Sequence, residues 1–217
     1  MIFFDSTNNH DTFLNFGAVP ETAFTGTMEH KFEESTTFKN ITAADIEGTE
    51  RTFEDCQFVN CDFSYANLSH LTFINCVMDT CNLSLIKLTQ TGLQGVEFKD
   101  CKITGVNFGE SSSFSLEVSF KKCVLDYTVW HKKKLKGTTF DDCSFEEADF
   151  SEADLTNAVF QKCNLNRAIF NRTILKGADL RSAYNFNIDP ENNTINKAKF
   201  SADALNGLLL KYNLVID

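Results

Sequence analysis

The chain has 217 residues, of which 22 are Phe and only 2 are Pro, and its formal net charge at pH 7 is −10. This length suits a single domain with a substantial core. The negative charge argues against direct binding of nucleic acid through phosphate neutralisation. No stretch approaches the ~20 apolar residues of a membrane span, and MIFFDSTNNH lacks the features of a signal peptide. We therefore expect a soluble, cytoplasmic protein without membrane contacts, whose eight cysteines are reduced.

Regular spacing of apolar residues begins only after an irregular start. Residues 1–35 show no steady pattern, and we interpret them as an N-terminal cap that shields the edge of the domain behind it. We assign residues 36–200 to a repeat domain, in which large apolar residues recur at every fifth position over most of the length. Five is the period of neither a strand, which repeats every two residues, nor a helix, which repeats every 3.6.

The five-residue spacing continues through most of the chain. Every fifth residue from Phe53 to Phe108 is a large hydrophobe, and after a slip of two residues the same holds from Phe120 to Leu180. The residue two places earlier is usually small. Two inward residues in every five imply a chain that turns a corner at each repeat, so four corners, or about 20 residues, complete one coil. Successive coils should stack at the ~4.8 Å spacing of β-strands.

The cysteines follow the same geometry. Six of them lie one coil apart, with 20 residues between neighbours and 22 across the slip: Cys61, Cys81, Cys101, Cys123, Cys143 and Cys163. They should form one column inside the wall, with Cys56 and Cys76 on the adjacent side. We interpret all eight as small buried hydrophobes. The alternative is a metal site or disulfides, but CxxxxC is not a zinc-finger spacing and no His accompanies the column. We expect no metal and no cofactor.

The repeat is interrupted once, at GESSSFSLEVS (residues 109–119), by two extra residues. Just beyond it, WHKKKLK (residues 130–136) places Lys133 on an inward position that suits a small residue. Because burying a charge is costly, we expect Lys133 to extend its amine to the rim and to loosen the wall locally. The basic patch Lys132–Lys136 is either a contact point for a partner or a repeat that has diverged from the pattern.

An acidic run follows. Residues 137–160 contain no Lys or Arg and seven acidic residues: Asp141, Asp142, Glu146, Glu147, Asp149, Glu152 and Asp154. One interpretation is a solvated surface at outward repeat positions. The other is an acidic strip, resembling a row of phosphates, that is offered to a basic groove on a partner protein, since long-range fields steer such encounters.

Residues 201–217 read as a short helix, with Ser201 as its N-cap, and then a short strand. The helix carries an apolar stripe at i, i+3 and i+4, and a second apolar run follows it. This segment either folds back on its own last coil or pairs with a second copy in a self-complementary homodimer. We predict the homodimer, with candidate contacts Leu205, Leu208, Leu209, Leu214, Val215 and Ile216.

Signals of catalysis are missing from the sequence. His10, His30, His70 and His131 lie in no Ser-His-Asp or HExxH context, and there is no glycine-rich phosphate loop. The flat walls of parallel ladders also offer no deep pocket. We therefore predict no catalytic residues and a protein that is not an enzyme.

Several repeats match the A(D/N)LXX signature of the pentapeptide-repeat proteins: Ala148-Asp149-Phe150, Ala153-Asp154-Leu155, Cys163-Asn164-Leu165 and Ala178-Asp179-Leu180. Over residues 36–200 the chain resembles this family, which implies a right-handed quadrilateral parallel β-helix, an all-β fold. The layout of interrupted rod and C-terminal segment is similar to the quinolone-resistance (Qnr-type) members. That likeness implies a DNA mimic that binds DNA gyrase or topoisomerase IV, a type II topoisomerase, with possible fluoroquinolone protection and a dimer formed through the C-terminus.

This sequence departs from the Qnr-type pattern at its interruption. Those proteins of Gram-negative bacteria carry outward loops that engage the topoisomerase, whereas residues 109–119 add only two residues to the repeat. The same repeat also serves many unrelated roles. A general protein-interaction scaffold or regulatory partner with an unrelated target is therefore the alternative function.

Overall fold

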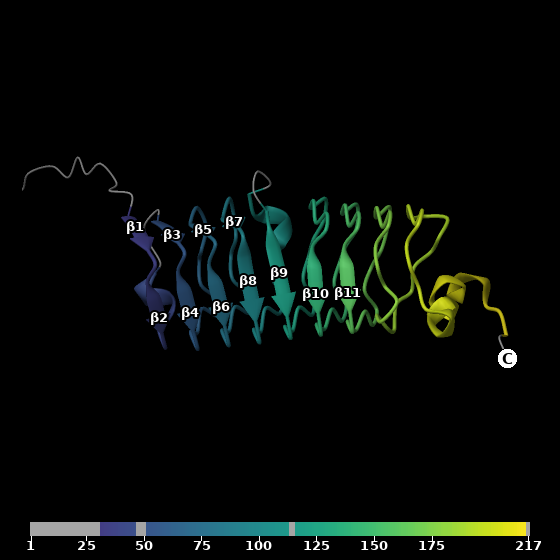
Figure 1. Cartoon of the computed structure of the whole chain (residues 1–217), viewed down its shortest axis with the longest axis horizontal. Helices are drawn as coiled ribbons and strands as arrows, with labels where there is room; N and C mark the ends of the chain where they lie inside the picture. Colours follow the sequence, from purple (N-terminus) through teal and green to yellow (C-terminus); the bar gives the residue numbers. More distant parts are fainter. Residues whose placement is uncertain (1–30, 47–50, 113–115, 216–217) are drawn as a thin grey trace, which may run out of the picture.

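The computed structural model describes residues 31–46, 51–112 and 116–215, which form a rod of stacked four-sided coils (Figure 1). Most of the expected N-terminal cap, residues 1–30, lies outside this part of the chain. The regular repeat starts before the expected boundary at residue 36, because Lys31–Glu34 already forms the first strand, β1. Its residues pair in register with Arg51–Glu54, one coil later.

Two parallel sheets form two sides of the rod. Side A carries the order β1-β3-β5-β7, with β3 at Arg51–Glu54, β5 at Thr72–Ile74 and β7 at Gly92–Gln94. Side B carries the order β11-β10-β9-β8-β6-β4-β2. Its strands are β2 (Thr37–Lys39), β4 (Gln57–Val59), β6 (Val77–Asp79), β8 (Val96–Lys99), β9 (Val118–Lys121), β10 (Thr139–Asp141) and β11 (Val159–Gln161).

The other two sides are held by isolated parallel bridges. Side C includes the bridge Asp62↔Asn82, and side D includes Asn67↔Lys87. The described residues also include four short 3₁₀ helices: η1 (Ala43–Asp45), η2 (Phe108–Glu110), η3 (Ala202–Leu208) and η4 (Leu210–Tyr212). The coil of four sides confirms the expected right-handed quadrilateral β-helix with a short C-terminal helix.

The core is one continuous column of side chains along the axis. Every fifth residue from Phe53 to Phe108 and from Phe120 to Leu180 is buried, as the spacing predicts. Rings from successive coils stack on one another; the Phe53 and Phe73 centroids, for example, lie 5.2 Å apart. Rings from adjacent sides meet edge-on, which aromatic pairs favour. No single coil could bury its apolar residues alone, so stability comes from the stack.

The slip in the repeat affects side A more than side B. On side B the ladder continues across it, because Phe98 pairs with Phe120. On side A the sheet ends at β7, and later coils pair there only through single bridges such as Lys134↔Asp154. The described residues on either side of the interruption still bond to the preceding coil, because the Ser112 amide donates to the Thr91 carbonyl oxygen and the Glu117 amide to that of Leu93.

The expectation for Lys133 is wrong. Its side chain is buried, only 2% exposed, and its Nζ donates a hydrogen bond to the backbone carbonyl oxygen of Ser111, 2.5 Å away. Burial lowers the pKa of this ammonium. The reason lies in the slip, which leaves the Ser111 carbonyl inside the wall, within reach of a long side chain on the next coil. Lys133 therefore fastens the chain at the interruption instead of reaching the rim.

The C-terminal helix also differs from the expected one. The segment is a 3₁₀ helix, η3, and the residues of it that cover the last coil are Ala204, Gly207 and Leu208. A Cβ at Gly207 would lie 2.5 Å from the Phe186 carbonyl oxygen, so only glycine permits this approach. Leu205, expected in the packing stripe, is 44% exposed.

Two further details of the C-terminal segment differ from expectation. Ser201 occupies the N-cap position of η3, but its side chain makes no capping hydrogen bond. Leu214 and Val215 form no strand, and Ile216 lies outside the described residues. A strand needs a free edge to pair with, and the helical segment already lies against the end of the rod (Figure 1).

Candidate interaction surfaces

The seven acidic residues of the 137–160 run encircle the rod instead of forming a strip along it. Asp141 lies on side B in β10, and Asp149 lies on side D, where it pairs with Val129. Asp154 lies on side A, paired with Lys134. This follows from the coil, in which successive repeats turn to the next side and only residues about 20 apart stack along the axis. We call the seven residues the acidic belt.

Basic side chains of neighbouring coils offset part of the belt. Glu147 pairs with Arg167 at 2.9 Å, Asp154 with Lys136 at 3.2 Å, and Glu152 with Lys132 at 3.7 Å. The two lysines belong to the patch Lys132–Lys136, so part of this patch binds the belt. Pairs this exposed stabilise little. Burial would raise the pKa of Asp154, but hydrogen bonds from Thr156 and Lys136 outweigh it and hold that pKa below its ordinary value.

The remaining belt carboxylates are the ones that a partner could bind. Within the described part of the chain, these four form no ion pair: Asp141, Asp142, Glu146 and Asp149. Asp142 lies at the corner between sides B and C. Glu146 accepts a hydrogen bond from Asn166, and Asp149 accepts one from the Ser151 amide. The belt thus presents unpaired negative charge on sides B, C and D.

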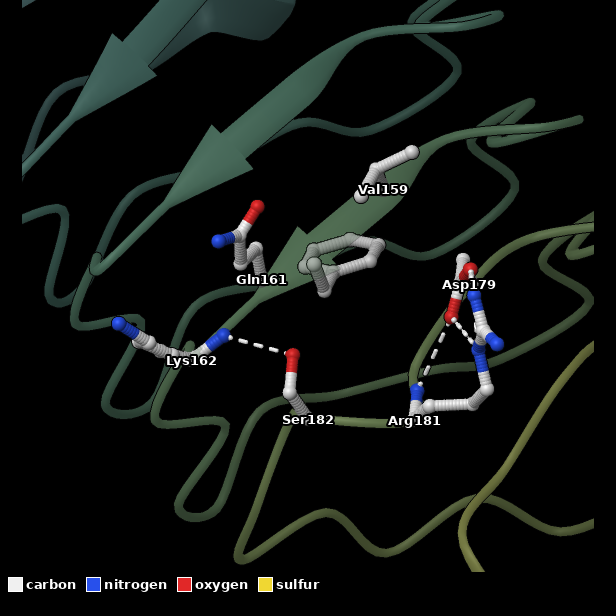
Figure 2. Close-up of a pocket in the computed structure, with 7 residues that line it drawn as sticks. Val159, Gln161, Lys162, Asp179, Arg181 and Ser182 are labelled. Carbon is white, nitrogen blue, oxygen red and sulfur yellow. Dashed lines mark hydrogen bonds and ion pairs between the residues drawn. The ribbon is translucent and has the colours of Figure 1, made fainter.

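A shallow depression of about 410 Å³ lies on side B beyond β11 (Figure 2). At one end of it Arg181 and Asp179, two residues apart in the chain, point toward each other (Figure 2), and their Nη2 and Oδ2 atoms lie 2.7 Å apart. This hydrogen bond from Arg181 is the main reason that the pKa of Asp179 falls to about 2. The Ser182 hydroxyl accepts from the Lys162 amide at 3.0 Å. These polar groups satisfy one another, and no nucleophile stands next to a base.

The cysteine column has the geometry of packing residues. All eight thiols are free and buried. Each of the thiols of Cys81 and Cys101 donates to a carbonyl oxygen of the previous coil, at 3.4 and 3.2 Å. Burial raises the pKa of Cys76 to about 11, and the hydrogen bond with Cys123 together with burial raises that of Cys101 to about 12. The reactive thiolate form is therefore suppressed. Among the described residues, no three His, Cys, Asp or Glu side chains are grouped so that they could hold a metal ion.

The C-terminal end exposes a cluster of apolar residues. Of the six candidate dimer contacts, Leu205, Leu214 and Val215 are exposed, whereas Leu208 packs against the core and Leu209 is half-buried. Leu210, which the stripe pattern does not include, is 54% exposed and joins them. Over the residues that the structure describes, no helix has the length and apolar character needed to cross a membrane.

The repeat region of the chain matches models of known protein families. The family model for the pentapeptide repeat region matches residues 51–128, and the model for pentapeptide repeats (8 copies) matches residues 134–166 and 148–184. A search of curated proteins finds no significant match.

Solved structures with the same fold include full-length QnrB1, described as a plasmid-mediated fluoroquinolone resistance protein. It is 16% identical, covers 84% of this chain and 100% of its own, and gives a TM-score of 0.55. Another solved structure is that of HetL from the cyanobacterium Nostoc, a pentapeptide repeat protein involved in heterocyst differentiation regulation. It is 16% identical, covers 78% of this chain and 87% of its own, and gives a TM-score of 0.44. The chain belongs to the pentapeptide-repeat family of structural and binding proteins, and its fold resembles that of the Qnr-type members.

Proposed function

We propose that this protein is a non-enzymatic rod that mimics duplex DNA and binds a type II topoisomerase, DNA gyrase or topoisomerase IV. The observation that carries the proposal is the alignment of full-length QnrB1, a fluoroquinolone resistance protein, over its whole length. With a net charge of −10, the chain is also negatively charged, as DNA is. A cytoplasmic location would place it in the same compartment as the enzyme.

The acidic belt is the proposed contact. Because it wraps the rod, a basic groove that closes around this part of the rod meets carboxylates on several sides at once. The four belt residues outside ion pairs need not break an ion pair in order to bind. Their field would speed the encounter with a basic groove, and added salt would weaken that effect.

The proposal predicts that the natural chain inhibits DNA supercoiling by purified gyrase at micromolar concentration, or protects the enzyme from a fluoroquinolone. The fourfold variant Asp141→Asn, Asp142→Asn, Glu146→Gln and Asp149→Asn should weaken the effect by roughly tenfold or more. The effect weakens because the variant lacks four carboxylates of the belt, while its core is unchanged.

The matched control removes the same number of charges from other coils: Asp55→Asn, Asp62→Asn, Asp79→Asn and Asp100→Asn. This control should inhibit supercoiling, or protect the enzyme, nearly as well as the natural chain. Equal loss in both variants would show that total charge matters and the belt does not. If the natural chain neither inhibits nor protects, the topoisomerase proposal fails and a scaffold with an unrelated target replaces it.

We also propose that the C-terminus joins two rods. The Lys211 ammonium lies 2.6 Å from carboxylate oxygens of both Asp189 and Glu191, and the Tyr212 hydroxyl lies 2.7 Å from Glu191. These contacts hold η4 against the preceding turn. Leu205, Leu210 and Leu214 remain exposed at the end of the rod, where a two-fold copy would bury them.

Light scattering at tens of micromolar should find the natural chain dimeric. The variant Leu205→Glu, Leu210→Glu and Leu214→Glu should be monomeric, because three charges would enter the apolar contact. The control Ile169→Glu with Ile174→Glu alters exposed apolar residues on the sides of the rod and should stay dimeric. A monomeric natural chain, or a glutamate variant that still dimerises, would contradict the proposal.

A further inference from the structure

Bulky apolar residues occupy backbone positions where they are unfavourable. Each coil turns its corners at residues with positive φ, most of which are Gly, Asn, Asp or other polar residues. Among the described residues, the large apolar exceptions are Tyr65, Leu85 and Tyr127, with φ of 62°, 59° and 60°. Left-handed backbone is disfavoured for such side chains. Three exceptions of the same kind call for a common explanation.

All three exceptions lie on one corner of the rod, between sides C and D. The stacking is set by backbone hydrogen bonds of 2.8–2.9 Å from each corner amide to the next coil: Tyr65 to Ser84, Leu85 to Thr104, Gly105 to Asp126 and Tyr127 to Glu146. Gly105 fills the gap between Leu85 and Tyr127. A Cβ there would lie 2.7 Å from Leu85 Cδ2, so the Leu85 side chain extends over the glycine. We call Tyr65, Leu85, Gly105 and Tyr127 the corner ridge.

The fold does not need the corner ridge. Tyr65 is 74% exposed, Leu85 47% and Tyr127 52%, so none of them belongs to the core. Asn makes the same turn at other corners, at Asn60 and Asn157 for example, and tolerates the left-handed region well. Strained residues that the core does not require are typical of functional positions, and a contiguous exposed apolar row is typical of a binding surface.

The charges beside the ridge indicate the chemistry of its partner. Charged residues of both signs flank the ridge: Asp62 and Lys102 on side C, Lys87 on side D, and Asp126 immediately before Tyr127. Only toward the Tyr127 end does one sign prevail, because the next coil there carries Glu146 and Glu147 of the acidic belt. A surface that receives the ridge therefore needs an apolar groove that adjoins the basic groove for the belt. Such a groove is a feature of a protein, and a nucleic acid lacks it.

We propose that the corner ridge is an apolar anchor that inserts into an apolar groove on the rod's protein partner, beside the basic groove that receives the belt. At its C-terminal end the ridge meets the acidic belt, since the Tyr127 amide bonds to Glu146 and Glu147 is the next residue at the same corner. The two surfaces can therefore engage one partner together. Tyr side chains often contribute most of the affinity in such contacts. The inference rests on the proposed function, because the partner to be tested is DNA gyrase.

The test uses the triple variant Tyr65→Asn, Leu85→Asn and Tyr127→Asn, with the belt left intact. Its matched control is His70→Asn and Gln90→Asn, which changes the next corner of two of the same coils at φ of 63° and 56° and touches no residue paired with the belt. Urea unfolding and the Kd for purified gyrase are measured for both variants and for the natural chain. We expect the ridge variant to be at least as stable as the natural chain and to bind at least ~10-fold more weakly. The control should bind within about twofold of the natural chain.

The outcomes separate this inference from the proposed function. If the natural chain binds gyrase and the ridge variant binds with the same Kd, the ridge is not an anchor, while the proposed function stands. If the ridge variant unfolds at clearly lower urea concentration, the ridge serves the fold and the inference is overturned. If the natural chain does not bind gyrase, the proposed function falls and takes the ridge inference with it.

Discussion

Replacing Phe145 with alanine should lower the free energy of unfolding by about 3–5 kcal/mol. The Phe145 side chain is fully buried. The centroid of its ring lies 5.1 Å from the ring centroid of Phe140, 5.3 Å from that of Phe150 and 6.0 Å from that of Phe160. The coils above and below cannot close the resulting cavity without breaking backbone ladders, so most of the loss remains uncompensated.

Urea denaturation measures this loss, with Phe32→Ala as the control. Phe32 is also a phenylalanine of the rod, but its side chain is 53% exposed in β1. Its replacement should change the free energy of unfolding by no more than ~0.5 kcal/mol. A loss below about 1 kcal/mol for Phe145→Ala would mean that the axial column is not the source of stability.

Raising the pH from 9 toward 11 should destabilise the rod by several kcal/mol. Folding raises the thiol pKa to about 11 for Cys76 and to about 12 for Cys101, Cys123 and Cys143, from an ordinary value of 9.0. A raised folded pKa gives stability that is complete below pH 9 and lost as the pH rises through the folded values. In that window the unfolded chain has released protons that the folded chain keeps, at ~1.4 kcal/mol per pH unit for each thiol.

The slope of stability against pH tests the thiol column directly. The double variant Cys101→Ala and Cys143→Ala removes two of these thiols, and alanine suits their position as it does at Ala148 and Ala153. Above pH 9 the stability of this variant should fall less steeply with pH. The difference in slope should correspond to roughly two protons. The lowered pKa of Lys133 acts in the opposite direction, but it is a single group. Stability that stays constant up to pH 10.5 would show that the thiols titrate as if exposed.

Local sequence rules worked where the structure repeats and failed where it departs from the repeat. The inward position of Lys133 was correct, yet its amine found the Ser111 carbonyl because the slip placed that carbonyl across the wall. In the C-terminal helix, the apolar stripe assumed 3.6 residues per turn. In the structure the close approach to Phe186 is made by Gly207, which has no side chain, and Leu205 is left exposed.

The sequence by itself determined the solenoid, because burial in every coil obeys a single five-residue rule that can be read from Phe53 to Leu180. It also determined the cysteine column, since residues 20 apart must stack once the coil has four sides. Only the tertiary structure decided which surface residues are neighbours. The acids of residues 137–160, adjacent in sequence, wrap around the rod, whereas Tyr65, Leu85 and Tyr127, far apart in sequence, lie on one corner. The reason is that the chain runs around the axis, while surface neighbours along the rod come from successive coils.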